Sequence, residues 1–131
     1  MKLSAVFSAL LGLGLLVQII LGELGLTTRA LRDIHATIGL AGLVLTAVAL
    51  RLSSRSRLSL AYLAALLAMV AVQAALGLIL YGIIFVDVGL FLLVEEVHRY
   101  NAYLMLAVGL IGGVAVAVTR RRSAQTVAES R

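Results

Sequence analysis

Four long stretches without a charged residue dominate this chain of 131 residues and constrain its fold more than any other feature. They cover residues 3–22, 34–50, 58–86 and 100–119, and the segments between them are short and charged. A helix that rises about 1.5 Å per residue needs about 20 apolar residues to cross the hydrocarbon core of a membrane. We therefore expect an all-α, integral membrane four-helix bundle with up-down-up-down topology.

Composition supports this fold class and excludes several others. With 63% hydrophobic residues and a mean hydropathy of +1.13, the chain is too apolar for a soluble domain. It contains no cysteine, which excludes disulfides, thiolate zinc sites and thiol catalysis within this chain. It also contains no proline, so we expect straight helices. The net charge of +5 comes from basic residues at the ends of the apolar stretches, which argues against a nucleic-acid partner.

The expected domain is a single bundle over residues 1–122, followed by a polar tail over 123–131 that we expect to be disordered. The connection over residues 85–94 is apolar apart from one aspartate, and it allows two interpretations. The fourth helix begins several turns before His98, or the loop dips into the membrane interface. The four helices are expected at about 3–23, 33–51, 57–84 and 93–120.

The distribution of charge predicts the orientation of the helices. If both termini and the loop near residue 54 share one side, that side holds eight of the eleven basic residues and a single acid, Glu129. The other side then holds three arginines and five acids. Cytoplasmic loops of membrane proteins carry an excess of lysine and arginine. We therefore expect a multi-pass protein of the cell membrane with both termini in the cytoplasm.

An internal repeat is the most informative pattern in the chain. Residues 17–22 read Val-Gln-Ile-Ile-Leu-Gly, and residues 72–77 read Val-Gln-Ala-Ala-Leu-Gly, 55 residues later. Each segment precedes a predicted helix that opens with a histidine, His35 or His98, and these two are the only histidines of the chain. The sequence therefore predicts two copies of a helical hairpin.

The repeat also predicts a site. In an up-down-up-down bundle the second and fourth helices lie on a diagonal, so His35 and His98, in the outer first turns, can face each other across the core. Small or flexible residues follow each histidine on its own helix face and leave room for a flat ligand, although such patterns are also typical of close helix packing. They are Gly39, Gly42, Ala102 and Met105.

Two facing imidazoles above small residues fit a haem with histidine axial ligands. Arg29, Arg32 and Arg99, the bases of the outer side, are candidate partners for haem propionates, or they form a solvated rim that balances the acids. Gln18 and Gln73 lie inside apolar helices, where an unpaired amide is costly. We expect them to hydrogen-bond across the bundle or to the ligand.

The run Glu95-Glu96-Val97-His98-Arg99 resembles the Glu-x-x-His-Arg motif of the haem A synthase family. The two Gln-x-x-Leu-Gly segments are similar to the helices that precede the haem-ligating helices of that family. The resemblance covers roughly residues 15–110 and implies one four-helix half of such an enzyme, similar to its compact archaeal variants. It implies His35 and His98 as axial ligands and Glu95 as the carboxylate at the reaction site.

This chain departs from the family pattern in two respects. It lacks the loop cysteine pair that many members carry, and Arg32 stands where a second copy of the Glu-containing motif would have its glutamate. The expected cofactor is haem b, with a haem O or haem A type molecule as a further candidate substrate. If one haem is oxidised beside a second one that passes electrons, a half-length chain needs either a homodimer or two haems in one small bundle. We expect the homodimer, embedded in membrane lipid, with a quinone or a redox protein as electron donor.

Three functions remain open from the sequence. The first is a b-type haem protein that transfers electrons or oxidises a haem side chain. The second is a small proton-coupled transporter, which would need an ionisable residue midway through a span, and none of the four stretches contains one. The third is a membrane assembly or scaffold subunit, for which glycine-rich helix faces would suffice.

Overall fold

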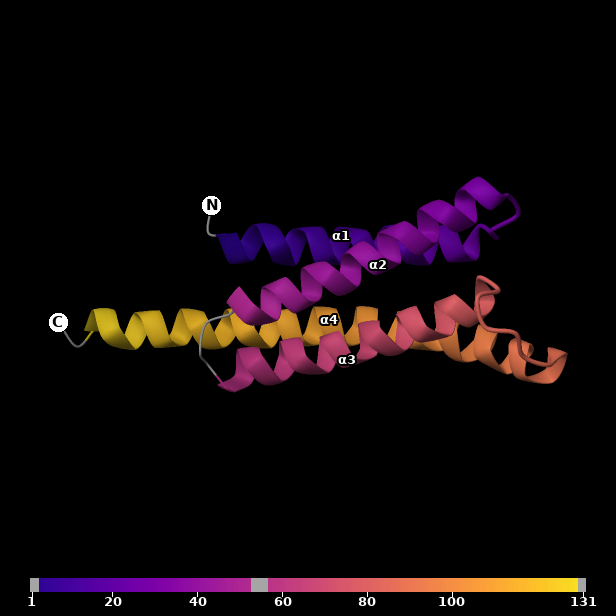
Figure 1. The fold of residues 1–131 in the computed structure, drawn as a ribbon. Helices are drawn as coiled ribbons and strands as arrows, with labels where there is room; N and C mark the ends of the chain where they lie inside the picture. Colours follow the sequence, from indigo (N-terminus) through magenta and orange to yellow (C-terminus); the bar gives the residue numbers. More distant parts are fainter. Residues whose placement is uncertain (1–2, 53–56, 130–131) are drawn as a thin grey trace.

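The computed structural model describes residues 3–52 and 57–129, and the regular structure within these residues is α-helical, with non-helical connections at 24–28 and 81–87. Lys2, Arg55 and Arg131, which contribute to the predicted charge asymmetry, lie outside the described residues. The predicted all-α class is confirmed. The described part forms four helices, α1 (Leu3–Glu23), α2 (Arg29–Leu52), α3 (Arg57–Leu80) and α4 (Val88–Glu129), shown in Figure 1.

The surface of the bundle is apolar along most of its length. Within the described residues, three segments are long and apolar enough to cross a membrane: α2, α3 and residues Val88–Thr119 of α4. Large apolar side chains such as Leu13 and Phe85 are exposed, the latter by 93%. Soluble proteins do not leave so much contiguous apolar surface in water, whereas lipid tails solvate it. The protein is therefore a multi-pass membrane protein.

Each helix packs against the next one along the chain, and α4 also contacts α1. In the described part, the backbones of the diagonal helices, α1 with α3 and α2 with α4, do not approach to contact distance. Helices α3 and α4 approach each other closely near Tyr62. Tyr62 donates a hydrogen bond of 3.2 Å to the carbonyl of Gly109, and a Cβ atom added at Gly112 would overlap the Tyr62 ring.

The ends of α3 and α4 differ from the expected ones because of capping. α3 ends at Leu80 instead of residue 84, since Gly82 adopts a φ of 89° and Ile83 donates a backbone hydrogen bond to Leu78. This arrangement is typical of a helix that ends at a glycine. α4 begins at Val88 instead of residue 93, because the Asp87 side chain accepts a hydrogen bond of 3.0 Å from the backbone N–H of Leu90. Of the two interpretations of residues 85–94, the early helix start is correct.

Two further helix ends differ from the sequence prediction. α2 begins at Arg29 instead of residue 33, with the Thr28 hydroxyl accepting a hydrogen bond of 3.2 Å from the backbone N–H of Leu31. α4 continues past Arg122 to Glu129, where a disordered tail was expected. Residues 123–129 contain no glycine or proline and include alanine, glutamine and glutamate, which favour a helix.

Candidate functional site

The two histidines meet across the diagonal of the bundle. The centres of the His35 and His98 rings lie 6.1 Å apart, and the ring planes are inclined by 53°. Because the backbones of α2 and α4 are not in contact, the side chains bridge the space between the two helices. His35 lies in the second turn of α2 and His98 in the third turn of α4. Both were expected in first turns, and they lie further from the helix starts because both helices begin earlier than predicted.

Each imidazole lies against the glycine of the repeated segment on the preceding helix. The Cε1 atom of His35 is 3.9 Å from the position that a Cβ atom would occupy at Gly22. The corresponding distance between His98 Cε1 and Gly77 is 3.4 Å. Glycines at these two positions therefore let the helices of each hairpin approach with an imidazole between them.

The polar atoms of the two rings are incompletely satisfied by the protein. The Nδ1 atoms of His35 and His98 are buried and have no hydrogen-bond partner among the described residues. A buried polar atom without a partner is costly, and in folded proteins it is often explained by a bound ligand, an ion or a functional role. Each ring therefore keeps one buried nitrogen available to a ligand, while the His98 ring is also hydrogen-bonded to the backbone of Gln73.

The geometry of the pair fits axial ligation of one metal. Two metal–nitrogen bonds of about 2 Å, with the further distance from each nitrogen to its ring centre, place two opposed imidazole centres about 6 Å apart. Among the described residues, no group of three or more histidine, cysteine, aspartate or glutamate side chains could hold a metal ion. A metal held by these two imidazoles alone would take its other ligands from outside the described residues, as the iron of a haem takes four from the macrocycle.

Gln18 and Gln73 both form hydrogen bonds between helices, as one of the two sequence interpretations proposed. Gln18 Nε2 donates to the backbone carbonyl of His35 at 2.8 Å, while its Oε1 atom is buried without a partner among the described residues. Gln73 Oε1 accepts a hydrogen bond of 2.7 Å from Asn101 Nδ2, which also lies 3.1 Å from the carbonyl of Met69. These contacts join α1 to α2 and α3 to α4.

Sequence reasoning missed Asn101, although a signal was present. It is the only asparagine of the chain, it lies in an apolar stretch, and it follows His98 by three residues, which places it on the same helix face. An amide in such a position needs a partner, and Gln73 was the available one on the preceding helix.

The small residues near the histidines have different surroundings. Gly39 is covered by Gln18, because a Cβ atom there would lie 2.7 Å from Gln18 Nε2. A Cβ atom at Gly42 would meet nothing within 4 Å. Ala102 is half-buried, and Met105 is 4% exposed. Gly42 is thus the more open of the two glycines, and Met105 belongs to the core.

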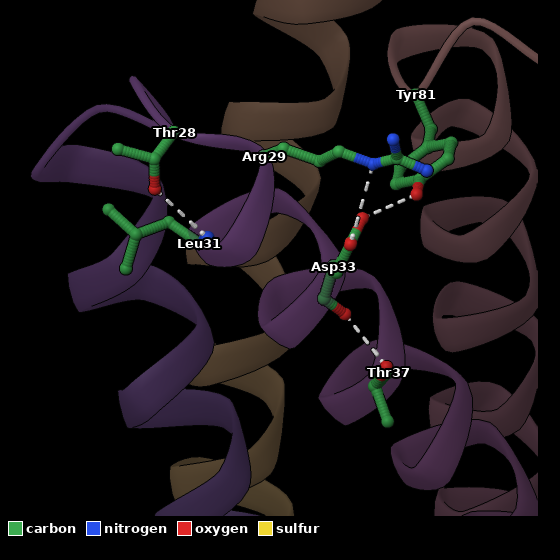
Figure 2. Close-up of polar contacts among 6 residues, drawn as sticks. All are labelled: Thr28, Arg29, Leu31, Asp33, Thr37 and Tyr81. Carbon is green, nitrogen blue, oxygen red and sulfur yellow. Dashed lines mark hydrogen bonds and ion pairs between the residues drawn. The ribbon is translucent and has the colours of Figure 1, made fainter.

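Acidic residues and tyrosines join the helices at the histidine end of the bundle. Asp33 lies between Arg29, at 3.9 Å, and the Tyr81 hydroxyl, which donates a hydrogen bond to it (Figure 2). This hydrogen bond to a carboxylate raises the pKa of Tyr81 above its usual value. Tyr103 donates a hydrogen bond of 2.7 Å to Glu23. One such pair therefore links α2 to the residue that follows α3, and the other links α1 to α4.

The arginines that we expect on the outer side, and Glu95, lie at this same end of the bundle. Arg99 Nε is 3.9 Å from Glu23, and Arg99 Nη2 is 3.8 Å from Glu95, with both side chains of the latter pair about half exposed. Arg32 shares a surface depression with Arg29, Asp33 and Tyr81. Exposed ion pairs of this kind contribute little stability. Glu95 has an arginine partner here, and it lines the same shallow surface depression as Glu96.

Replacing Asn101 by Leu is expected to destabilise the fold by about 1–3 kcal/mol, because it leaves Gln73 Oε1 buried without a donor. Reversible unfolding in mixed detergent micelles measures this change. The double variant Asn101→Leu with Gln73→Leu removes both polar groups and should recover most of the loss. If the double variant is less stable than the single one, the hydrogen bond does not account for the effect.

Comparisons with known protein families, with characterised proteins and with solved structures found no match to this chain.

Proposed function

We propose that the protein is an integral membrane b-type haem protein that transfers electrons, with His35 and His98 as the axial ligands. The observation that carries this proposal is the 6.1 Å separation of two imidazoles whose buried Nδ1 atoms lack partners among the described residues. A bound haem would supply one-electron redox chemistry. With no cysteine in the chain, the haem would be held noncovalently.

The proposal includes an up-down-up-down bundle of four spans built from two copies of a helical hairpin. Its support is the packing of consecutive helices and the equivalent contacts of Gly22 with His35 and of Gly77 with His98. The distribution of charge supports cytoplasmic termini and a haem site toward the outer face.

Electron transfer is favoured over oxidation of a haem side chain by the surroundings of Glu95. The resemblance to haem A synthases would give this residue a part at the reaction site. Its side chain is half exposed and forms an ion pair with Arg99 at the end of the bundle. In this proposal Glu95 keeps Arg99 in place, and Arg99, Arg29 and Arg32 supply positive charge at the end where haem propionates would lie.

The test is the absorption spectrum of protein purified in detergent from haem-replete cells. We expect a red protein with about one noncovalent haem b per chain and a low-spin spectrum. Extraction with acidified solvent should release all of the pigment. A colourless preparation with normal helical content would refute the haem proposal and leave a scaffold or a transporter as the function.

The proposed orientation predicts a cytoplasmic location for the chain after Arg122. A reporter that is active only in the cytoplasm should therefore be active when it is fused after Arg122. A second fusion in the connection after α3, at Ile83, serves as the control and should report the outer side. An outer location for the Arg122 fusion would contradict the orientation and place the histidines at the cytoplasmic face.

A further inference from the structure

The two hairpins differ in the residue that stands three positions after each histidine. Three residues after His98 stands Asn101, which gives Gln73 its hydrogen bond. Three residues after His35 stands Ile38, which has no polar group to offer, and Gln18 Oε1 is buried without a partner among the described residues. The side-chain oxygen of Gln73, near His98, therefore accepts a hydrogen bond, whereas that of Gln18, near His35, has no donor among the described residues.

His98 belongs to a firmly packed face of α4. Val94, His98, Asn101 and Met105 follow one another at the spacing of a single helix face. Val94 and Met105 are 6% and 4% exposed, and Asn101 is hydrogen-bonded to α3. The ring itself lies 3.4 Å from the Cβ position of Gly77. Movement of His98 would therefore disturb a buried helix interface.

His35 has weaker support. Its ring lies 3.9 Å from the Cβ position of Gly22, and in the described part of α2 only Thr46, three turns away, is buried. The connection before α2 contains Gly25 with a φ of 76°, a conformation that glycine adopts at little cost. The hydrogen bond that Gln18 donates to α2 goes to the backbone carbonyl of His35 and does not restrain the imidazole.

We infer that the two imidazoles are not equivalent: His35 is the exchangeable ligand, and the position that it vacates is a binding site for a small neutral diatomic molecule. This inference rests on the proposed function. Exchange of an axial ligand requires the imidazole to leave, and the imidazole with fewer packing contacts leaves at lower cost. His98 then remains as the permanent ligand.

The first experiment uses carbon monoxide as the probe on the reduced, haem-loaded protein. His35→Ala should keep most of its haem and bind carbon monoxide fully, whereas His98→Ala should lose most of its haem. Far-ultraviolet circular dichroism of both variants shows whether they fold. Full haem retention in His98→Ala together with haem loss in His35→Ala would overturn the inference and leave the haem proposal intact.

A matched pair of substitutions tests the cause of the difference. Ile38→Asn gives Gln18 the donor that Gln73 already has, and it should weaken carbon monoxide binding about fivefold, the equivalent of one net hydrogen bond. Asn101→Ile removes the donor from the other hairpin and should lower the haem content, because His98 then loses support on its own helix face. Unchanged carbon monoxide affinity in Ile38→Asn together with full haem content in Asn101→Ile would overturn the inference.

Hydrogen exchange provides a measurement that does not depend on haem. Backbone amides of residues 33–39 should exchange at least about fivefold faster than those of residues 96–103 in detergent-purified protein. Equal protection of the two segments would overturn the difference in support between the histidines. A colourless protein would overturn the proposed function and this inference with it.

Discussion

Gly112→Ala is expected to destabilise the bundle by about 1–3 kcal/mol, the cost typical of overpacking a well-packed interior. A Cβ atom at this position would overlap the ring of Tyr62, and the ring is held by the hydrogen bond from its hydroxyl to Gly109. The helices α3 and α4 would have to separate, or the ring would have to leave its place. Reversible unfolding in mixed micelles gives the change in free energy.

The neighbouring glycine is the matched control. A Cβ atom at Gly113 would meet nothing within 4 Å, so Gly113→Ala should stabilise α4 by about 0.5–1 kcal/mol through its higher helix propensity. Combining Gly112→Ala with Tyr62→Leu should recover part of the loss. The same effect from both single alanine substitutions would contradict the close approach of Tyr62 to Gly112.

The helical fold follows from the sequence because the lengths of the apolar stretches match the thickness of a membrane. The helix ends do not follow from that pattern. The sequence places Asp87 in the connection over residues 85–94 but does not show that its side chain caps α4 at Val88. Gly82 ends α3 through its positive φ, a backbone property that hydropathy does not encode.

The histidine pair could be predicted because each histidine follows one of the two glutamine segments, at the start of the next apolar stretch. The structure shows the two imidazole rings close together, while haem ligation by them stays a prediction. The partner of Gln73 could not be predicted from the repeat, since Asn101 occurs in only one of the two copies. The ion pairs and tyrosine contacts of the rim depend on how side chains from different helices meet, and no single-helix periodicity contains that information.

The rim nevertheless has a clear relation to the site. Tyr81 with Asp33 joins α2 to the residue after α3, and Tyr103 with Glu23 joins α1 to α4. These are contacts between the two hairpins, whereas the glycine–histidine contacts lie within each hairpin. The rim contacts therefore add to the packing of α2 on α3 and of α1 on α4, through which the two hairpins are held together.

Gly77→Val is expected to reduce bound haem by about tenfold, a loss within the range of overpacking energies. The added methyl groups would occupy the space in which His98 Cε1 lies, 3.4 Å from the Cβ position, and would turn the ring away from His35. Gly22→Val, where the distance is 3.9 Å, should displace His35 and keep most of the haem. The haem-to-protein ratio and the low-spin fraction, measured by absorption, distinguish the two outcomes.

Gly113→Val controls for the presence of a β-branched residue inside a helix, because a Cβ atom there meets nothing within 4 Å. It should leave the haem content unchanged. If Gly77→Val also binds a full complement of low-spin haem, His98 does not depend on its contact with the repeated glycine. The glycine of each Gln-x-x-Leu-Gly segment would then serve helix packing alone, and the recurrence of glycine and histidine would no longer support the haem site.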